Sequence, residues 1–332
     1  MAKKTDVIEL IKEKVRPYGP GDRDLPTFSY SKLEVFKNCR YQYDFKYNQG
    51  MRSSDTTLAL ELGSLLHYVM EQKGKMLVTA GEVDYEILNR ITQRGVFETD
   101  EKTQETLLGV KELKQKYWDT WYEPDNASGM NYDEKLEVFD KVLHSEMENE
   151  EWKPYLFEHP FKFVWDDKLV IHGFIDRIDK RGEDLRTIDY KTSKKSYDKS
   201  KLVTSLQFGI YALAIFSEFG VLPVESLYRF ILIDETQKAL SLGWEKRLIK
   251  ALDKIFNQIE ECEETGIWVP KPTPLCHWCY MCKTNPNAGE YKNYCRFYSL
   301  WTPDNKTFAV NEEWNGNTGV VNKEGKKRVL VF

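Results

Sequence analysis

Two carboxylates and a lysine stand out in the segment from Gly173 to Lys191, which reads GFIDRIDKRGEDLRTIDYK. Asp176 lies in one alternating apolar run, Asp189 and Lys191 lie in a second, and a turn-like stretch at 180–184 separates the two runs. Two such runs joined by a short polar loop predict a β-hairpin. Because side chains alternate across a strand, Asp189 and Lys191 are expected on one face, with Asp176 on the neighbouring strand.

Such a trio can support the hydrolysis of a phosphodiester. Carboxylates hold a hard divalent cation, and a bound cation polarises a phosphate and lowers the pKa of a bound water. A lysine beside the cation can position that water and offset negative charge in the transition state. The same Asp-x-Lys pattern is also typical of a solvated strand face with a weak surface ion pair, and the motif alone leaves that alternative open.

Composition sets the class of protein. A chain of 332 residues, 41% hydrophobic and 30% charged, is long enough for one large globular domain or two modest ones. With 48 Lys and Arg against 53 Asp and Glu, the net charge is −5, so a nucleic-acid protein of this composition must concentrate its positive charge locally. The N-terminal MAKKTDVIELIKEK has no apolar core typical of a signal peptide, and no run reaches membrane-spanning length. We therefore expect a cytoplasmic protein without membrane association.

The first third of the chain predicts an arm followed by helices. Residues 1–27 are polar and end in a stretch rich in proline and glycine, which predicts an N-terminal arm; a single domain is expected over 28–300. Ser31 and Glu34 form a capping-box pattern that opens a helix to about Tyr47.

A second amphipathic helix is predicted over 57–75, with Gly63 and His67 four residues apart on one face. From 84 to 150 the pattern is charged and helical without a strand candidate, which predicts a helical insertion or subdomain.

The remainder predicts a catalytic core over 158–233 and a cysteine segment near the C-terminus. Three strand-like runs, FKFVW, LVIHGFIDRID and LRTIDY, precede a basic loop. The elements expected after that loop are a helix over about 202–219, a strand over about 224–233, a long charged helix over about 244–265, a cysteine-bearing segment at 276–295 and a hairpin-like tail at 301–332.

Further residues could complete a site at the hairpin, although each has an ordinary structural interpretation. His67 can supply an imidazole to a metal or be a partly buried structural histidine. Glu158, directly before the first strand-like run, can reach the site or solvate the strand end. Gln207 and Tyr211 share a helix face and can orient a lysine or a phosphate, or be edge residues of an amphipathic helix. Local positive charge for nucleic acid, or a solvated loop, is provided by Lys194, Lys195, Lys199 and Lys201.

In this order the motifs resemble the RecB-type nucleases of the PD-(D/E)xK superfamily. The elements of the resemblance are Gly63-x3-His67, Glu158, Gly173-Phe-Ile-Asp176, Asp189-Tyr-Lys191 and Gln207-x3-Tyr211. The resemblance implies an α/β fold with a restriction-endonuclease-like core, a mixed sheet flanked by helices. It also implies that His67, Asp176, Asp189 and the carbonyl of Tyr190 bind Mg²⁺ or Mn²⁺. By the same resemblance Lys191 is the catalytic lysine, Glu158 an auxiliary carboxylate, and Gln207 and Tyr211 form the family's Gln-x3-Tyr motif.

The cysteines extend the resemblance. In the cytoplasm, six cysteines favour metal or redox chemistry over disulfides. Cys39 stands alone near the N-terminus, whereas Cys276, Cys279, Cys282 and Cys295 are clustered. Thiolates in such clusters bind Zn²⁺ or an iron–sulfur cluster. The split arrangement resembles AddB-type nucleases and the CRISPR-associated adaptation nucleases, in which four cysteines hold a [4Fe-4S] cluster that joins the ends of the nuclease domain.

Two features depart from those relatives. Arg40 follows the first cysteine where they usually have proline, and the spacing from Cys279 to Cys295 is wider than theirs. The preferred ligand set is Cys39, Cys276, Cys279 and Cys295, with Cys282 as the alternative fourth ligand and Zn²⁺ as the alternative to the cluster. Cys262 is interpreted as an ordinary helix residue.

Together these features predict a metal-dependent DNA nuclease, an exonuclease on single-stranded or frayed ends, with a structural [4Fe-4S] cluster. Its partners would be DNA and proteins of repair, recombination or replication, and the oligomeric state stays open. The alternatives are a non-catalytic DNA-binding or assembly subunit that keeps the fold, and a zinc-binding protein with an unrelated hairpin. An intact Asp176, Asp189 and Lys191 set argues against the binding subunit, which has no need of these residues.

Overall fold

The computed structural model describes residues 4–52, 58–80, 151–240, 243–271 and, between 273 and 295, positions 273, 276, 278–282, 285 and 289–295. The predicted helical insertion at 84–150 and the predicted tail at 301–332 lie outside the described residues. The chain divides into two compact units. The sheet unit comprises residues 1–28 and 56–248, and the cysteine unit comprises 29–55 and 249–332, so the predicted single domain over 28–300 spans parts of both.

A seven-stranded mixed sheet forms the centre of the sheet unit. Its strands follow the order β1-β3-β4-β5-β6-β7, with β2 paired to β4. Along that order the pairs are antiparallel except β5 with β6, which are parallel. The predicted α/β fold class is confirmed. The strand bounds are β1 Val15–Pro17, β2 Thr27–Ser29, β3 Lys153–Trp165, β4 Leu169–Arg181, β5 Asp184–Lys191, β6 Glu225–Phe230 and β7 Glu235–Lys238.

The parallel pair requires a crossover, because two parallel neighbours cannot be joined by a tight turn. Helices α8 (Lys199–Val203) and α9 (Leu206–Phe219) supply it. Ser205 caps α9 by accepting from the backbone N–H of Phe208, and Gly220 ends it in the left-handed conformation with φ 72°. Residues 199–219 are long and apolar enough to cross a membrane by composition, but 67% of their most apolar 18-residue window is buried inside the structure, as expected for a core helix.

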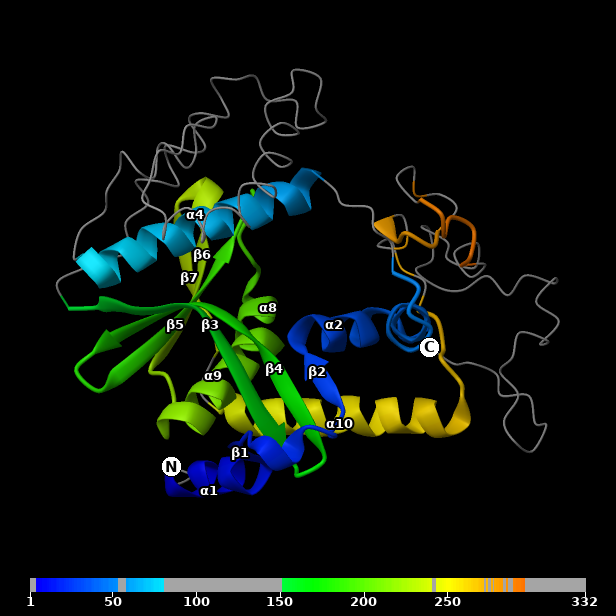
Figure 1. Ribbon diagram of the computed structural model, residues 1–332, viewed down its shortest axis with the longest axis horizontal. Coiled ribbons are helices and arrows are strands. Elements are labelled where there is room, and N and C mark those ends of the chain that lie inside the picture. Colours follow the sequence, from blue (N-terminus) through cyan, green and yellow to red (C-terminus); the bar gives the residue numbers. More distant parts are fainter. Residues whose placement is uncertain are drawn as a thin grey trace, which may run out of the picture. The chain divides into compact units, whose positions relative to one another are not determined.

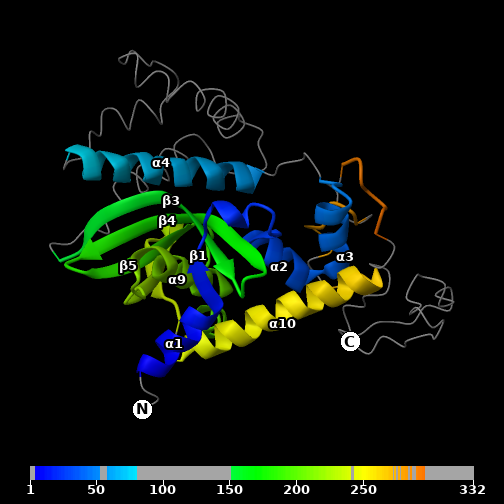
Figure 2. The same cartoon turned by 60° about the horizontal axis from the view of Figure 1, so that its bottom comes forward.

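Helix α4 (Leu58–Ala80) lies on the face of the sheet opposite α9 (Figure 2). Contacts from β3 show this division: the Phe157 ring lies against Gly74 of α4, and the Phe161 ring lies 6.0 Å from Tyr211 of α9. The predicted helix over 57–75 is therefore confirmed, and it continues to Ala80. Two helical layers thus enclose the sheet region that carries the predicted catalytic residues.

The prediction of an N-terminal arm is corrected by the structure. Helix α1 (Lys4–Lys14) leads into β1, which pairs with the far end of β3 as an edge strand. Arg16 in β1 forms an ion pair with Asp22 at 2.8 Å and another with Asp167 at 2.5 Å. A strand of three residues has no measurable alternation, so the polar composition of this segment concealed its place in the sheet.

The cysteine unit is built from short helices around aromatic side chains. It contains α2 (Tyr30–Asn38), α3 (Arg40–Tyr43), a π-helical turn at Asp44–Asn48 and the part of α10 (Trp244–Thr265) from residue 249 onward (Figure 1). Trp268 stacks on Tyr43 with ring centroids 5.5 Å apart and meets the edge of Phe36 at 6.5 Å. The prediction of a helix over 244–265 is confirmed.

The predicted first helix is correct in place and wrong in detail. It begins at Tyr30, because Ser29 rather than Ser31 accepts the capping hydrogen bond from the N–H of Lys32. It is also interrupted at Cys39, whose extended backbone (φ −160°) separates α2 from α3. This break places Cys39 at a helix junction instead of within a continuous helix.

The close approach of α4 to β3 depends on Gly74. A Cβ atom at this position would lie 1.9 Å from the Phe157 ring. We expect Gly74→Ala to lower the free energy of unfolding by roughly 1–3 kcal/mol, because overpacking displaces the ring or the helix. Chemical denaturation measures the change.

Gly63 on the same helix is the matched control. A Cβ there would meet only the Thr192 hydroxyl, at 3.4 Å, so Gly63→Ala should stabilise by about 0.5–1 kcal/mol through helix propensity. Equal effects of the two substitutions would contradict a specific role for Gly74.

Candidate active site

The predicted β-hairpin is confirmed, and its register brings the two aspartates together. Strands β4 and β5 pair antiparallel with Arg177 opposite Ile188, and Asp176 and Asp189 are the residues that directly adjoin this pair. Gly182, in the turn between them, has the left-handed φ of 57° that favours glycine. Asp189 and Asp176 are buried, with exposed fractions of 1% and 8%. The hairpin therefore carries two carboxylates into the interior rather than onto a solvated face.

His67, Glu158 and Asp176 form a group suited to a metal ion. One ligand atom from each lies within 4.8 Å of those of the other two. The Asp176 Oδ2 atom lies 3.4 Å from His67 Nδ1 and accepts a hydrogen bond of 2.8 Å from the backbone N–H of Tyr190. The Tyr190 ring in turn meets the edge of the imidazole at 6.2 Å. Residues from α4, β3, β4 and β5 thus converge on one point.

Glu158 enters this group through an unusual backbone conformation. It lies inside β3, not before the first strand as predicted, and its φ is 42°, in the left-handed region. Phe157 faces α4, whereas His159 on the other side of Glu158 hydrogen-bonds Glu218 of α9 at 2.8 Å. In a regular strand both neighbours would face the same way. The left-handed residue reverses the alternation, at a cost of about 1–2 kcal/mol for a side chain other than glycine.

Asp189 belongs to a second, adjoining network. Its Oδ2 lies 2.5 Å from Lys191 Nζ, and its Oδ1 accepts from Gln207 Nε2 at 2.6 Å. Gln207 Nε2 also lies 3.0 Å from the Tyr211 hydroxyl, and Gln207 Oε1 accepts from Lys191 at 3.3 Å. The predicted face shared by Asp189 and Lys191 is therefore observed, and α9 covers it. Gln207 holds both ionic groups through one amide.

Burial, together with repulsion between neighbouring carboxylates, raises the pKa values of Asp176 and Glu158. Burial, and then the nearby Asp189, raises the pKa of Asp176 well above its usual range. Burial and Asp176 likewise raise the pKa of Glu158 to about 7. Burial lowers the pKa of His67, which favours the neutral imidazole that binds metals.

Lys191 is the ammonium in this arrangement. Burial opposes its charge, but the neighbouring Asp189 carboxylate outweighs that effect and raises the pKa of Lys191 above its usual value. The group is therefore charged at neutral pH, and its role is to hold and offset negative charge rather than to accept a proton.

The donor set fits a divalent cation. Buried carboxylate oxygens with raised pKa values lack compensating positive charge, and a cation bound by His67, Glu158 and Asp176 would provide it. Oxygen donors suit Mg²⁺ and Mn²⁺, and an imidazole is a ligand more typical of transition metals.

Sequence reasoning missed two residues around Lys191. The Lys191 ammonium lies 5.4 Å from the centre of the Tyr228 ring, and the Tyr228 hydroxyl lies 2.7 Å from Ser205 Oγ. Tyr228 reaches this place because β5 and β6 pair with Asp189 opposite Tyr228. The local sequence carries no signal for such a residue, because its place depends on parallel pairing with a strand nearly forty positions earlier in the chain.

Sequence reasoning also missed a cluster of buried charged side chains within the hairpin strands β4 and β5. Asp179 accepts from Arg177 Nε at 2.5 Å and from Arg186 Nη2 at 2.6 Å, and all three residues are buried. Arg177 further donates to the Tyr190 hydroxyl at 3.5 Å. The alternating polar residues of the two strands were the available signal.

The four predicted nucleic-acid lysines follow Lys191 directly. Lys194 and Lys195 lie in the loop after β5, and Lys199 and Lys201 lie in α8; all are exposed. The Lys201 ammonium lies 3.3 Å from the centre of the Tyr197 ring. Their contact with nucleic acid stays a prediction.

The structure also brings Cys39 to the C-terminal cysteines. Burial raises the pKa of the Cys276 thiol, and neighbouring Cys39 and Cys282 raise it further. Burial raises the pKa of Cys279 to about 12, and Cys295, Cys39 and Cys276 add to the rise. The backbones of Cys282 and Cys295 pair in an isolated β-bridge. Cys262 instead lies 3.9 Å from Arg40 Nη1.

The fold and these motifs agree with comparisons against known proteins. A family model of the PD-(D/E)XK nuclease superfamily matches residues 27–283, and the chain belongs to that superfamily. Among curated proteins it is similar to an ATP-dependent helicase/deoxyribonuclease subunit from Clostridium perfringens strain SM101, with 24% identity over 226 residues. The corresponding proteins of strains ATCC 13124 and 13 are 23% identical over the same length. The match covers 59% of this chain and 18% of each relative, so the chain spans under a fifth of their length.

The raised pKa of Glu158 predicts a gain in stability from Glu158→Gln in metal-free protein. A pKa raised from 4.5 to about 7 costs the folded state at most about 3 kcal/mol once the carboxylate ionises. Solvent screening at this half-buried group reduces the cost to about 1 kcal/mol. Below pH 4.5 the group is protonated in both states, so the cost is absent; it grows as pH rises and is complete above pH 7.

Glu158→Gln should therefore stabilise the protein by about 1 kcal/mol near pH 8 and by little near pH 5, in denaturation experiments with EDTA. The exposed Glu183→Gln is the control and should show no such pH dependence. A stabilisation of Glu158→Gln that is equal at both pH values would contradict the assignment.

Proposed function

We propose that this protein is a metal-dependent DNA nuclease that acts as an exonuclease on single-stranded or frayed DNA ends. The observation that carries the proposal is the convergence of two groups, the His67, Glu158 and Asp176 donors and the Asp189–Lys191 ion pair, on adjoining strands. A surface ion pair or a binding scaffold gives no reason to gather two buried aspartates with a half-buried glutamate and a half-buried lysine.

Each residue has a distinct role in the proposed hydrolysis. His67, Glu158 and Asp176 would hold Mg²⁺ or Mn²⁺, joined by Asp189 and by the carbonyl of Tyr190. When bound, the cation supplies a Lewis acid and a water of lowered pKa. Lys191, charged at neutral pH, orients the attacking water and offsets charge on the phosphate.

Gln207 and Tyr211 are positioning residues. Gln207 bonds both Asp189 and Lys191, and Tyr211 bonds Gln207, so the two ionic groups keep one relative orientation. Preorganisation of this kind favours the transition state because no side chain needs to move when charge develops.

DNA is the proposed substrate for two reasons. The similar Clostridium perfringens proteins are named deoxyribonuclease subunits. In this chain, exposed lysines at 194, 195, 199 and 201 follow the catalytic strand and can neutralise phosphates. Those relatives are also named as helicase subunits, which supports a helicase or another repair, recombination or replication protein as a partner.

Substitution of the central residues tests the proposal. Lys191→Ala and Asp176→Asn should each lower cleavage of end-labelled single-stranded DNA by about 10²–10³-fold with Mg²⁺ or Mn²⁺, because each removes charge stabilisation or a metal ligand. Lys168→Ala, on the exposed turn between β3 and β4, is the matched control and should cleave like the unsubstituted protein. Binding of DNA by the unsubstituted protein without any cleavage would reject the nuclease in favour of a non-catalytic DNA-binding protein.

We further propose a structural [4Fe-4S] cluster held by Cys39, Cys276, Cys279 and Cys295, with Cys282 as the alternative fourth ligand. The gathering of Cys39 with cysteines more than 230 positions away supports it, because Cys39 lies close enough to raise the pKa values of Cys276 and Cys279. A shared cluster would close this long loop and stabilise the cysteine unit.

Metal analysis of anaerobically purified protein separates the alternatives. Iron with inorganic sulfide should be present, and Cys39→Ser or Cys276→Ser should lose it while Cys262→Ser retains it. Comparing Cys282→Ser with Cys295→Ser identifies the fourth ligand. Stoichiometric zinc without sulfide would contradict the cluster and leave the nuclease proposal unaffected.

A further inference from the structure

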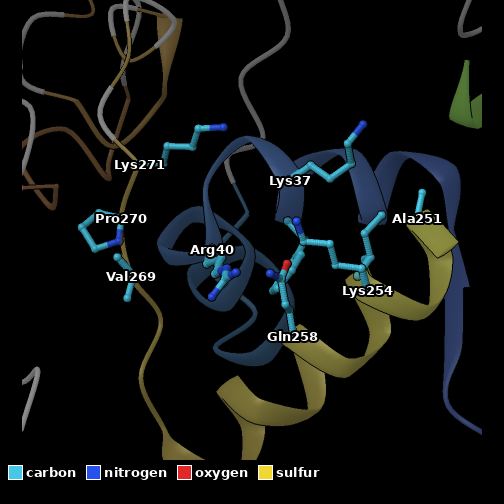
Figure 3. A pocket seen from close by; sticks show the side chains of 10 residues that line it. Lys37, Arg40, Ala251, Lys254, Gln258, Val269, Pro270 and Lys271 are labelled. Atoms are coloured by element: carbon cyan, nitrogen blue, oxygen red, sulfur yellow. The ribbon is translucent and has the colours of Figure 1, made fainter. Parts of the chain in front are cut away.

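A cavity in the cysteine unit takes no part in the proposed hydrolysis. Its volume is about 570 Å³, and it lies between α10, the α2–α3 segment and the extended chain at 269–271 (Figure 3). All of its lining residues belong to the cysteine unit. This volume can hold a small organic ligand with several rings, so the chemistry of the lining residues indicates which kind of ligand fits.

Positive charge lines this cavity. Lys37, Arg40, Lys254 and Lys271 all contribute to its wall, and among the described residues no carboxylate does. Figure 3 shows Lys254 extending from α10 and Lys271 from the opposite, extended segment. Lys37 also forms an ion pair with Glu34 at 2.7 Å, just outside the lining. In a chain with a net charge of −5, this is a local concentration of cations that attracts an anion.

The rest of the wall is mostly apolar. Ile255, Val269 and Pro270 line the cavity, and the Arg40 guanidinium lies over the Phe36 ring, 5.3 Å from its centre. A guanidinium beside an apolar wall offers a planar surface against which a nucleobase can stack. Gln258 adds an amide that both donates and accepts hydrogen bonds, as a base edge requires.

We propose that this cavity binds one nucleotide unit of an unpaired nucleic-acid strand. Lys254 and Lys271 would contact the phosphates, and the base would lie against Arg40 and the apolar wall. An acidic protein segment would also satisfy these cations, but the nuclease superfamily to which the chain belongs favours a nucleic-acid strand as the occupant. The identity of the occupant rests on the proposed function, because a nuclease brings such a strand to the protein.

Binding without hydrolysis tests the proposal. The probe is a fluorescein-labelled single-stranded oligothymidylate in EDTA, and the readout is fluorescence anisotropy over a range of salt concentrations. Lys254→Ala/Lys271→Ala should weaken binding about tenfold and make the dependence of log K on log salt shallower by about 1.4, as expected for two lost phosphate contacts on a single strand. Lys37 and Arg40 are left unchanged because they flank Cys39.

Lys250→Ala/Lys292→Ala is the matched control. It removes the same charge from exposed positions of the same unit that do not line the cavity, and its affinity should stay within about twofold of the unsubstituted protein. Equal affinities of the cavity variant and this control, with the iron content of both unchanged, would overturn the proposal.

A second arm separates a strand from a free nucleotide. Thymidine monophosphate that competes as well as the oligothymidylate would overturn binding of a strand. Since EDTA removes hydrolysis from the measurement, the result is independent of the cleavage test. If Lys191→Ala did not affect cleavage, the proposed nuclease mechanism would be rejected. The affinity of the cavity for the oligothymidylate, measured in EDTA, would not be affected by that result.

Discussion

The repulsion among three clustered carboxylates, two of them buried and one half-buried, is the constraint on which the rest of the sheet unit depends. Glu158, Asp176 and Asp189 come from three successive strands; Asp189 raises the pKa of Asp176, and Asp176 raises the pKa of Glu158. The contacts that lower the pKa of Asp176 are mainly the Tyr190 backbone N–H and the charge of Lys191. One ammonium and one amide cannot balance three carboxylates in a poorly solvated site. The fold therefore maintains a deficit of positive charge that a divalent cation would remove.

Holding such an unfavourable arrangement requires rigid surroundings. Helix α9 is buried along almost its whole length, and its Gln207 fixes Asp189 and Lys191 from one side of the sheet. On the other side, Gly74 lets α4 approach β3 closely, so that His67 meets Asp176. The left-handed Glu158 between these layers is a strained residue at the place where the chemistry requires a carboxylate, which is where strain is retained in functional sites.

The sequence predicted the elements whose signals are local. Alternation identified the β4–β5 hairpin, and helical periodicity identified α10 with correct bounds. The family resemblance selected residues that lie in two adjoining networks: His67 lies 3.4 Å from Asp176, and Gln207 donates a hydrogen bond to Asp189. Their catalytic roles stay predictions.

The failures have physical causes of their own. Glu158 was placed outside its strand because a left-handed residue breaks the alternation on which strand prediction relies. Tyr228 was missed because its position depends on pairing of distant parallel strands, and Ser29 was passed over because Ser31 offers a similar capping pattern. In each case the local sequence is compatible with more than one structure, and tertiary contacts determine which one forms.

Two arginines of the hairpin strands show why the deficit of positive charge around the catalytic carboxylates persists. Arg177 and Arg186 are buried within the same two strands as Asp176 and Asp189, and in principle could neutralise them. Asp179 instead engages both guanidinium groups at hydrogen-bond distance. Because an ion pair that is already formed in a buried site is costly to break, these arginines are not available to the catalytic carboxylates. Asp179 and the two arginines thus pair with one another within the hairpin. The catalytic carboxylates are left with a deficit of positive charge that a bound cation would remove.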